Sequence, residues 1–287
     1  VWMGEILFRT KLSENLFKGL APWMQKLPGG LIHVNVVGCA LFAAISGSSA
    51  ATVATVGKMS IPELRKRKYP ETILLGSLAG SGTLGLLIPP SIILIIYGVT
   101  VQESIAKLFI AGIIPGIMIA LIFMSYVIVW SLINKQSMPV SLETFSFLEK
   151  IKKSKQLMPV ILLILAVIGS IYTGIATATE AASLGVVGAL ILSYLQKSLT
   201  KETFKASLLG ATKTSCMIAF ILAGATFLSL AMGFTGLPRN LAIWIQGMEL
   251  SPYVLIFVLM VFYIILGMFL DGISAVVLTM AIIEPMI

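Results

Sequence analysis

Across 287 residues, 58% of the side chains are hydrophobic, only 11% are charged, and the mean hydropathy is +1.02. Because soluble domains contain about 25% charged residues, this composition excludes an ordinary soluble protein and predicts an all-α polytopic membrane protein. The net charge of +8 does not predict nucleic-acid binding, because the basic residues follow the alternation of loops between apolar segments and so report membrane topology.

Residues 1–30 are interpreted as the end of a membrane span followed by a cytoplasmic amphipathic arm. Residues 31–59 form two apolar legs, 31–46 and 50–59, around the small polar tip Ser-Gly-Ser-Ser at 46–49. Each leg is shorter than the roughly 20 residues that cross a bilayer core. The pattern predicts a re-entrant helical hairpin, and the basic segments on both sides of it place its open end at the cytoplasm.

Residues 60–103 contain a predicted membrane helix that is interrupted by Gly-Leu-Leu-Ile-Pro-Pro at 85–90. Proline in a helix interior costs roughly 3 kcal/mol, and no water in the hydrocarbon core can satisfy the carbonyl groups that it frees. We expect irregular backbone over 84–88, with Pro89 and Pro90 in the first turn of a new half-helix. The alternative is a packing kink whose small residues let a neighbouring helix approach.

Residues 104–250 are expected to form scaffold spans and the start of a second repeat. Five apolar segments are predicted to cross the membrane: 71–100, 104–134, 156–174, 178–196 and 214–234. If successive loops alternate sides, all of the 20 basic residues except Lys107 and Arg239 share one side, which the positive-inside rule assigns to the cytoplasm. Thr177 and Glu180 have the spacing of a capping box, which we favour over a proton relay.

Residues 251–287 are expected to form a second hairpin, with the polar tip Leu-Asp-Gly-Ile-Ser-Ala at 270–275. The arm before it, Leu-Pro-Arg-Asn-Leu at 237–241, repeats Leu-Ser-Glu-Asn-Leu at 12–16 before the first hairpin. Because five crossings separate the hairpins, the second must open on the opposite face, which is the inverted-topology repeat of many secondary transporters. The alternative is a pair of ordinary interrupted helices.

The first polar tip and the broken helix together form a candidate ion site. Hydroxyl and carbonyl oxygens suit hard cations, and helix N-termini suit an anionic group of a substrate. We therefore expect a sodium site here, with the substrate close by. The sodium ligands would be Ser46, Ser48 and the backbone of 85–90, and the residues near the substrate would be Ser49 and Ser91.

The second tip carries Asp271, and an acidic residue inside a membrane is a functional candidate by default. Together with Gly272 and Ser274, it could hold a second sodium ion or the substrate. The alternative is a structural cap at the turn of the hairpin.

The remaining reactive side chains are assigned structural roles. His33 has no acidic or cysteine neighbour in the sequence, so we expect it to form hydrogen bonds only. Cys39 and Cys216 lie in apolar runs and are expected to be buried, inert thiols. The sequence contains no hydrolase, nucleotide or metal motif, so we expect no enzyme, and ion gradients would have to drive transport.

Four stretches of the sequence resemble the large membrane subunit of tripartite ATP-independent periplasmic (TRAP) transporters. They are HVNVVGCALFAAISGSSAATVATVG (33–57), GSLAGSGTLGLLIPPSIILIIYG (76–98), GIATATEAASLGVVGAL (174–190) and LGMFLDGISAVVLT (266–279). The stretches occur in family order, and the resemblance extends over essentially the whole chain.

The resemblance implies an elevator-type transporter, in which a transport domain carrying the hairpins and broken helices moves against a scaffold. It implies sodium-coupled import of a carboxylate-bearing solute, of the C4-dicarboxylate or sialic-acid type, across the bacterial inner membrane. The implied partners are a soluble periplasmic substrate-binding protein and a small four-helix membrane subunit. The implied sodium ligands are Ser46 and Ser48 with the backbone of Gly85, Ile88 and Pro90.

Two features depart from the family pattern. A second broken helix is expected after the second hairpin, but the sequence stops at Ile287, so part of the second sodium site and of the substrate site is expected outside it. Glu284 stands where the family more usually has an apolar residue, and its role is open.

The competing function is a single-component sodium/carboxylate symporter of related fold. A membrane scaffold or an intramembrane enzyme would not explain the inverted repeat.

Overall fold

The computed structural model describes all residues except 11, 140–145, 156, 249–250 and 284–287, so Glu284 lies outside the described residues. All regular elements in the described part are helices, and no strand occurs among them. The helices form two compact units, one of Val1–Leu94 with Ile105–Thr212 and one of Ile95–Ser104 with Lys213–Ile287. The two units are described separately.

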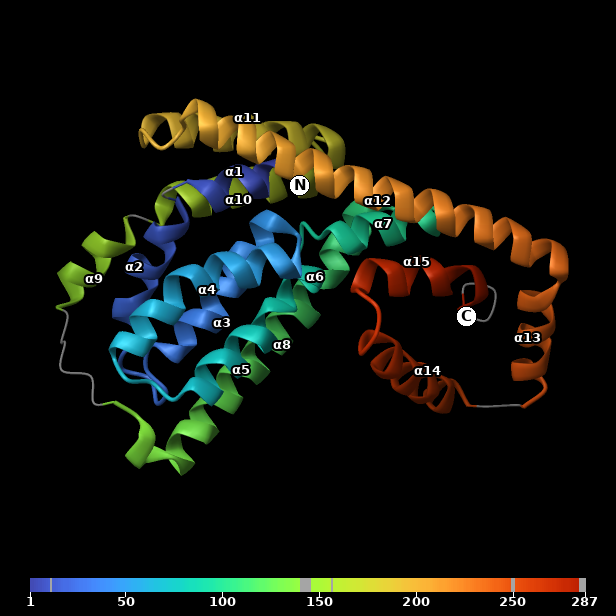
Figure 1. Cartoon of the computed structure of the whole chain (residues 1–287), viewed down its shortest axis with the longest axis horizontal. Coiled ribbons are helices and arrows are strands. Elements are labelled where there is room, and N and C mark those ends of the chain that lie inside the picture. Colours follow the sequence, from blue (N-terminus) through green and yellow to red (C-terminus); the bar gives the residue numbers. More distant parts are fainter. Residues whose placement is uncertain (11, 140–145, 156, 249–250, 284–287) are drawn as a thin grey trace. The chain divides into compact units, whose positions relative to one another are not determined.

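The first unit contains most of the helices (Figure 1). They are α1 (Trp2–Arg9), α2 (Leu12–Met24), α3 (Ile32–Ser46), α4 (Ser49–Lys66), α5 (Glu71–Gly82), α6 (Leu84–Leu87), the start of α7 (Ile92–Thr100), α8 (Ile105–Ile133), the 3-10 helix η1 (Lys135–Ser137), α9 (Phe147–Ser154), α10 (Met158–Tyr172), α11 (Ala178–Leu195) and the start of α12 (Lys201–Thr235). Helix α3 is apolar on all sides and is buried along most of its length between α4 and α5. Such a helix is typical of a protein interior.

The second unit contains the remainder of α7 and α12, together with α13 (Leu237–Gln246), α14 (Pro252–Gly267) and α15 (Gly272–Ile283). Ser251 caps α14, because the Val254 N–H donates to the Ser251 hydroxyl at 3.4 Å. Helices α14 and α15 pack together, and the hydroxyl groups of Tyr263 and Thr279 lie 2.6 Å apart between them. Two helices around a polar turn therefore lie where the second hairpin is predicted, and the re-entrant path of this segment stays a prediction.

The apolar helices confirm an all-α polytopic membrane protein. In the described part of the chain, four helical stretches are long and apolar enough to cross a membrane: Glu71–Thr100, Ile105–Ile133, Ala178–Leu195 and Lys201–Thr235. A fifth is formed by α9 and α10 if this pair, bent by 57°, counts as one span. The four long stretches correspond to four of the five predicted crossings, and α10 lies within the fifth, 156–174. Helices α3 and α14 are apolar but shorter, as expected for hairpin legs.

The base of the first hairpin differs from the prediction, because α4 continues to Lys66 instead of ending near residue 59. The backbone N–H of Leu31, at the start of the hairpin, donates to the Tyr69 hydroxyl at 3.1 Å. Burial raises the pKa of Tyr69 above its usual value. Arg65 forms two hydrogen bonds with Glu71, of 2.7 and 3.0 Å. These contacts hold the end of α4 close to the start of α5.

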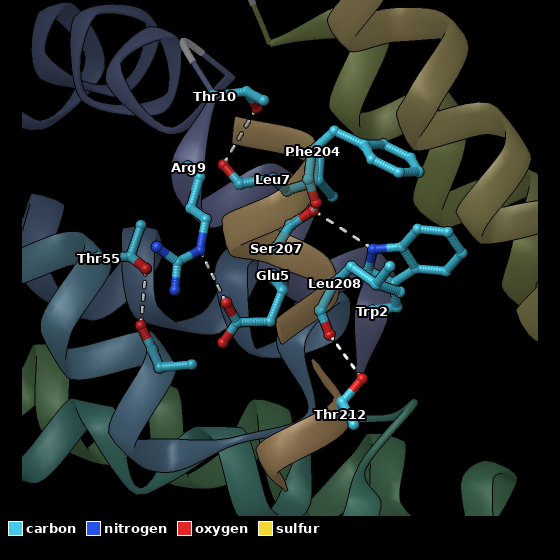
Figure 2. A network of polar contacts seen from close by, with 11 residues as sticks. Trp2, Glu5, Leu7, Arg9, Thr10, Thr55, Phe204, Ser207, Leu208 and Thr212 are labelled. Carbon is cyan, nitrogen blue, oxygen red and sulfur yellow. Dashed lines mark hydrogen bonds and ion pairs between the residues drawn. The ribbon is translucent and has the colours of Figure 1, made fainter. Parts of the chain in front are cut away.

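Helix α1 packs against the first turns of α12, both within the first unit (Figure 2). The Trp2 indole N–H donates to the Ser207 hydroxyl at 3.3 Å, and the Trp2 ring meets Phe204 edge-on. Glu5 and Arg9 form an ion pair of 3.0 Å one turn apart. Gly210 has no side chain, and a β-carbon there would collide with the Glu5 carboxylate. The absence of a side chain at Gly210 therefore leaves room for the Glu5 carboxylate beside α12.

Two polar interpretations from the sequence are confirmed. Thr177 and Glu180 form a capping box at the start of α11: the Glu180 N–H donates to the Thr177 hydroxyl at 3.3 Å, and the Thr177 N–H donates to the Glu180 carboxylate at 2.8 Å. His33 Nε2 lies 2.8 Å from the carbonyl oxygen of Pro28. Both sites have hydrogen-bonding roles, as expected.

The two cysteines differ in their surroundings. Cys39 in α3 is fully buried, as predicted, but Cys216 in α12 is exposed on the surface of the chain. The expectation of burial was wrong for Cys216, because α12 carries apolar residues on several faces, and an apolar neighbourhood in sequence does not identify the side that packs.

Candidate functional site

The tip of the first hairpin is a tight turn of two residues between α3 and α4. Helix α3 ends at Ser46, and Gly47 adopts the left-handed conformation with φ 60°, which glycine accommodates without steric cost. Ser48 is extended and caps α4, since the Ala51 N–H donates to its hydroxyl at 3.4 Å. The chain therefore reverses at the predicted position.

A compact hydrogen-bond network stabilises this turn around the carbonyl oxygen of Ser48. The Thr52 hydroxyl donates to this oxygen at 2.7 Å, the Thr52 N–H at 3.0 Å, and the Ser46 hydroxyl at 3.2 Å. The Ser46 and Thr52 hydroxyl oxygens also lie 2.9 Å apart. Thr52 is fully buried. Thr52 was not predicted from the sequence, although its spacing of four residues from Ser48 places its side chain one helical turn from the cap.

The break in the long helix lies later than predicted. Residues Leu84–Leu87 form the helical turn α6, so the expectation of irregular backbone was wrong for 84–87 and holds only for Ile88, which is extended. The chain leaves the helix at Ile88, passes through Pro89 and Pro90, and resumes helical conformation only at Ile92. The expectation that the two prolines lie in the first turn of the new half-helix was therefore wrong, because they precede it. The reason is local: the residue before a proline is disfavoured in the α conformation, and this applies to Ile88 and Pro89 but not to Gly85.

The hairpin tip packs directly on the broken helix, as predicted. The backbone N–H of Ile92 donates to the Gly47 carbonyl oxygen at 3.2 Å. A β-carbon at Gly47 would lie 2.7 Å from the Pro90 carbonyl oxygen, and one at Gly85 would lie 2.8 Å from the Ser48 carbonyl oxygen. The two glycines therefore allow backbone to touch backbone, and the structure brings the tip together with Gly85 and Pro90.

The other predicted residues of this site have different surroundings. Ser49 begins α4, and its backbone nitrogen faces Gly85. The fully buried Ser91 donates its hydroxyl to the Leu86 carbonyl oxygen at 2.6 Å. The Ile88 N–H donates to the Leu84 carbonyl oxygen at 2.9 Å, and its side chain packs on α8. Ile88 can therefore contribute to the site only through its backbone carbonyl.

Helix α8 supports the break from the side through two glycines that were not predicted from the sequence. A β-carbon at Gly112 would lie 2.9 Å from the Leu87 carbonyl oxygen, and one at Gly116 would lie 2.9 Å from the Ile88 side chain. The spacing Gly-x-x-x-Gly is the signal that could have found them, because it marks close helix contacts in membranes. Helix α8 thus covers one side of the unwound segment, and irregular backbone in a bilayer requires such contact with protein.

The region where the first hairpin tip meets the broken helix offers uncharged oxygen atoms as possible ligands. Helix α3 ends at the tip and α6 ends at the break, so both C-terminal ends direct carbonyl oxygens towards this region, while α4 and α7 begin there. C-terminal ends favour cations and N-terminal ends favour anions. Hydroxyl and carbonyl oxygens without a carboxylate fit a hard monovalent cation. No group of three or more His, Cys, Asp or Glu gathers anywhere in the described residues.

The tip of the second hairpin, in the second unit, is built around a carboxylate. Asp271 accepts hydrogen bonds from the N–H groups of Ile273 at 3.1 Å and Ser274 at 3.3 Å, and from the Ser274 hydroxyl. These contacts make Asp271 a cap of α15, which begins at Gly272. Asp271 is exposed. A role of Asp271, Gly272 and Ser274 in binding an ion or substrate stays a prediction beside this capping role.

Comparison with known proteins identifies the family. Residues 1–287 match the family described as Tripartite ATP-independent periplasmic transporter, DctM component. The chain is 34% identical to the C4-dicarboxylate TRAP transporter large permease protein DctM of Pseudomonas aeruginosa, over 88% of this chain and 58% of that protein. It is 31% identical to the sialic acid TRAP transporter large permease protein SiaM of Vibrio cholerae, over 99% of this chain and 66% of that protein.

A third relative is the isethionate TRAP transporter permease protein DctMQ of Oleidesulfovibrio alaskensis, 32% identical over 96% of this chain and 43% of that protein. The chain thus spans less than two thirds of the length of these curated relatives, which are transporter permeases and not enzymes. Together with the apolar helices, the relatives identify a multi-pass inner-membrane protein. Because the family match covers every residue, the chain belongs to the DctM component family of tripartite ATP-independent periplasmic transporters.

Proposed function

We propose that the whole protein is a sodium-coupled secondary importer of a carboxylate-bearing small solute. The observation that carries this proposal is the contact between the first hairpin tip and the broken helix, where Ile92 donates to Gly47. Two groups of oxygen atoms, from Ser46–Ser48 and from the segment ending at Pro90, meet there. A monovalent cation that crosses a membrane potential of 100 mV into the cell supplies about 2.3 kcal/mol. A few sodium ions therefore provide enough free energy to accumulate the solute.

The proposed membrane arrangement is an inverted repeat with two re-entrant hairpins. It is supported by the short apolar helices α3 and α14 and by the polar turn after each of them. In an elevator mechanism, each hairpin would move together with its broken helix against a scaffold of the other spans. The tight backbone contact at Gly47 and Gly85 supports movement of α3–α6 and the first residues of α7, all in the first unit, as one body.

The proposed partners are a soluble periplasmic substrate-binding protein and a small membrane subunit. The family description names a periplasmic, tripartite system, and one relative carries the joint name DctMQ. The names of other relatives include C4-dicarboxylate and sialic acid, which support a substrate with a carboxylate group. The helix N-termini of α4 and α7 would attract that group.

The decisive experiment is uptake into proteoliposomes that contain the complete transporter. We expect uptake of labelled organic acid only when an inward sodium gradient and the binding protein are both present. Uptake that persists without the binding protein would instead support a single-component sodium/carboxylate symporter. Uptake that is independent of sodium in all arms would overturn the proposed coupling.

The residues of the first sodium site are tested by Ser46→Ala and Ser48→Ala. Both changes remove a hydroxyl from the tip, and we expect the sodium concentration for half-maximal uptake to rise several-fold. Ser48→Ala also removes a helix cap worth about 1 kcal/mol, so thermal stability is measured in parallel, whereas Ser46 caps no helix. Ser170→Ala in α10, whose hydroxyl bonds only within its helix at 2.8 Å, is the matched control. Unchanged sodium dependence in both tip variants would contradict this placement.

A further inference from the structure

Helix α9 (Phe147–Ser154) is a short basic helix that the site described above does not use. One face of it packs on α2 through Trp23, within the first unit. The Trp23 indole N–H donates to the Ser154 hydroxyl at 2.7 Å, and the Trp23 ring meets the Phe147 ring edge-on. The ammonium group of Lys150 lies 5.4 Å from the centre of the Trp23 ring. Positions 147, 150 and 154 therefore form the docked face of the helix.

The adjacent face of α9 combines apolar and basic side chains. At 100° per residue, positions 148, 151, 152 and 155 share one continuous arc of about 100° beside the docked face. Leu148 is 77% exposed and Ile151 is 42% exposed, and the lysines on this arc, Lys152 and Lys155, are exposed as well. We call these four residues the α9 stripe.

The position of α9 along the chain places the stripe at a membrane surface. Helix α10, which starts at Met158, is an apolar candidate span, and α9 meets it at a bend of 57°. A helix that turns away from the membrane-crossing direction directly before a span lies at the bilayer boundary. The basic loops of this chain mark the same boundary as cytoplasmic, where the leaflet carries anionic lipids.

We propose that α9 is an interfacial helix whose stripe binds anionic phospholipids of the cytoplasmic leaflet. Leu148 and Ile151 enter the boundary between headgroups and acyl chains, and Lys152 and Lys155 extend to the lipid phosphates, as long basic side chains do at membrane interfaces. The contact with Trp23 then connects the bound lipid layer to α2. This inference does not depend on the transported substrate or on the coupling ion.

Trp23 provides a local probe, because it touches α9 and is 39% exposed. The complete transporter is reconstituted into phosphatidylcholine nanodiscs that contain increasing fractions of brominated phosphatidylglycerol or brominated phosphatidylcholine, which quench tryptophan fluorescence. The Trp23 signal is the part of the emission that Trp23→Phe removes. We expect phosphatidylglycerol to be preferred over phosphatidylcholine at this position by roughly fivefold or more, as the attraction of one lysine to an anionic surface predicts.

Paired variants separate charge from structure. The double variant Lys152→Gln, Lys155→Gln should reduce the ratio of phosphatidylglycerol to phosphatidylcholine preference to about one. The double variant Lys152→Arg, Lys155→Arg should retain the preference for phosphatidylglycerol. Salt at 1 M should reduce the parent's preference, because it shortens the Debye length to about 3 Å. The apolar variant Leu148→Gln, Ile151→Gln should weaken quenching by both lipids, and an unchanged thermal midpoint establishes that each variant is folded.

The proposal is overturned if the parent shows no preference, or if the preference is the same in the glutamine and arginine variants. Strong quenching by both lipids in the Leu148→Gln, Ile151→Gln variant would contradict insertion of the stripe. If the lysine variants instead lose a co-purifying small subunit while lipid preference is unchanged, the stripe is a protein interface, and the lipid proposal is wrong.

Discussion

The two hairpin tips of this chain use different chemistry to complete a similar turn. The first tip is neutral and largely enclosed: Ser46 is 5% exposed, Thr52 is fully buried, and the turn rests on the broken helix. The second tip is charged and open, with the exposed Asp271 capping α15. A tip that packs on a broken helix can satisfy its polar groups with backbone and hydroxyl partners. An open tip depends on a carboxylate that water can also solvate.

This difference indicates how each tip would bind a cation. At the first tip, the carbonyl oxygens are fixed by their neighbours before any ion arrives, and such preorganisation reduces the cost of binding. Among the described residues of the second tip, 270–275, the charged oxygen atoms are those of Asp271, which already accept three hydrogen bonds from Ile273 and Ser274. Substitutions at the first tip should therefore affect stability and sodium binding together, and substitutions at the second tip should separate the two.

The largest effect is expected for Gly47→Val. Valine is strained at φ 60°, and its β-carbon would collide with the Pro90 carbonyl oxygen, so the free energy of unfolding should fall by about 3 kcal/mol or more. The thermal unfolding midpoint in detergent measures the loss. Gly76→Ala is the control, since nothing lies within 4 Å of that position and alanine in a helix should stabilise by roughly 0.5–1 kcal/mol. A Gly47→Val protein as stable as the parent would refute the tight contact between tip and break.

A somewhat smaller effect is expected for Gly112→Leu in α8. The added side chain would push against the Leu87 carbonyl oxygen and displace the break, so we expect a loss of about 1–3 kcal/mol in stability and weaker sodium-dependent uptake. Gly169→Leu in α10 is the matched control, because Gly169 has open space around it. Equal behaviour of the two variants would mean that α8 does not support the break.

The hydroxyl groups inside the hairpins allow a direct comparison. Thr52→Val removes one of the three donors to the Ser48 carbonyl oxygen, and should cost about 0.5–1.5 kcal/mol and raise the sodium concentration for half-maximal uptake. Thr279→Val is its counterpart in the second hairpin, where the hydroxyl donates to the Ala275 carbonyl oxygen at 2.7 Å. It should reduce stability similarly with less effect on sodium. A comparable change in sodium dependence in both variants would show that the first tip has no special role.

The smallest change in stability is expected for Asp271→Asn. Asparagine caps helices about as well as aspartate, so the thermal midpoint should shift little, whereas a cation held by the carboxylate would bind more weakly. We expect a clear rise in the sodium concentration for half-maximal uptake. Glu180→Gln, which preserves the capping box of α11, should change neither quantity. If Asp271→Asn also changes neither, Asp271 is a structural cap only.

Local patterns in the sequence predicted the positions of the helices and of both polar turns. The Ser-Gly-Ser-Ser tip, the capping box of Thr177 and Glu180, and the apolar segments follow from short-range propensity and hydropathy. The break was misplaced by about one helical turn, because glycine was taken as the weak point and the restriction before Pro89 was overlooked. Cys216 was misjudged because hydropathy identifies an apolar helix but not its packed face.

By itself, the sequence determined that this chain is a helical membrane protein with two polar hairpin turns and a proline-broken helix. These features are local, because hydropathy, hydrophobic periodicity and proline each influence the conformation of only a few neighbouring residues. Only the tertiary structure decided which groups meet at the site. Thr52 joins Ser46 within the turn, Gly47 and Gly85 let two backbones touch, and Gly112 brings α8 against the break. These contacts depend on shape complementarity between segments distant in sequence, and close packing of side chains and backbone is a property of the folded chain alone.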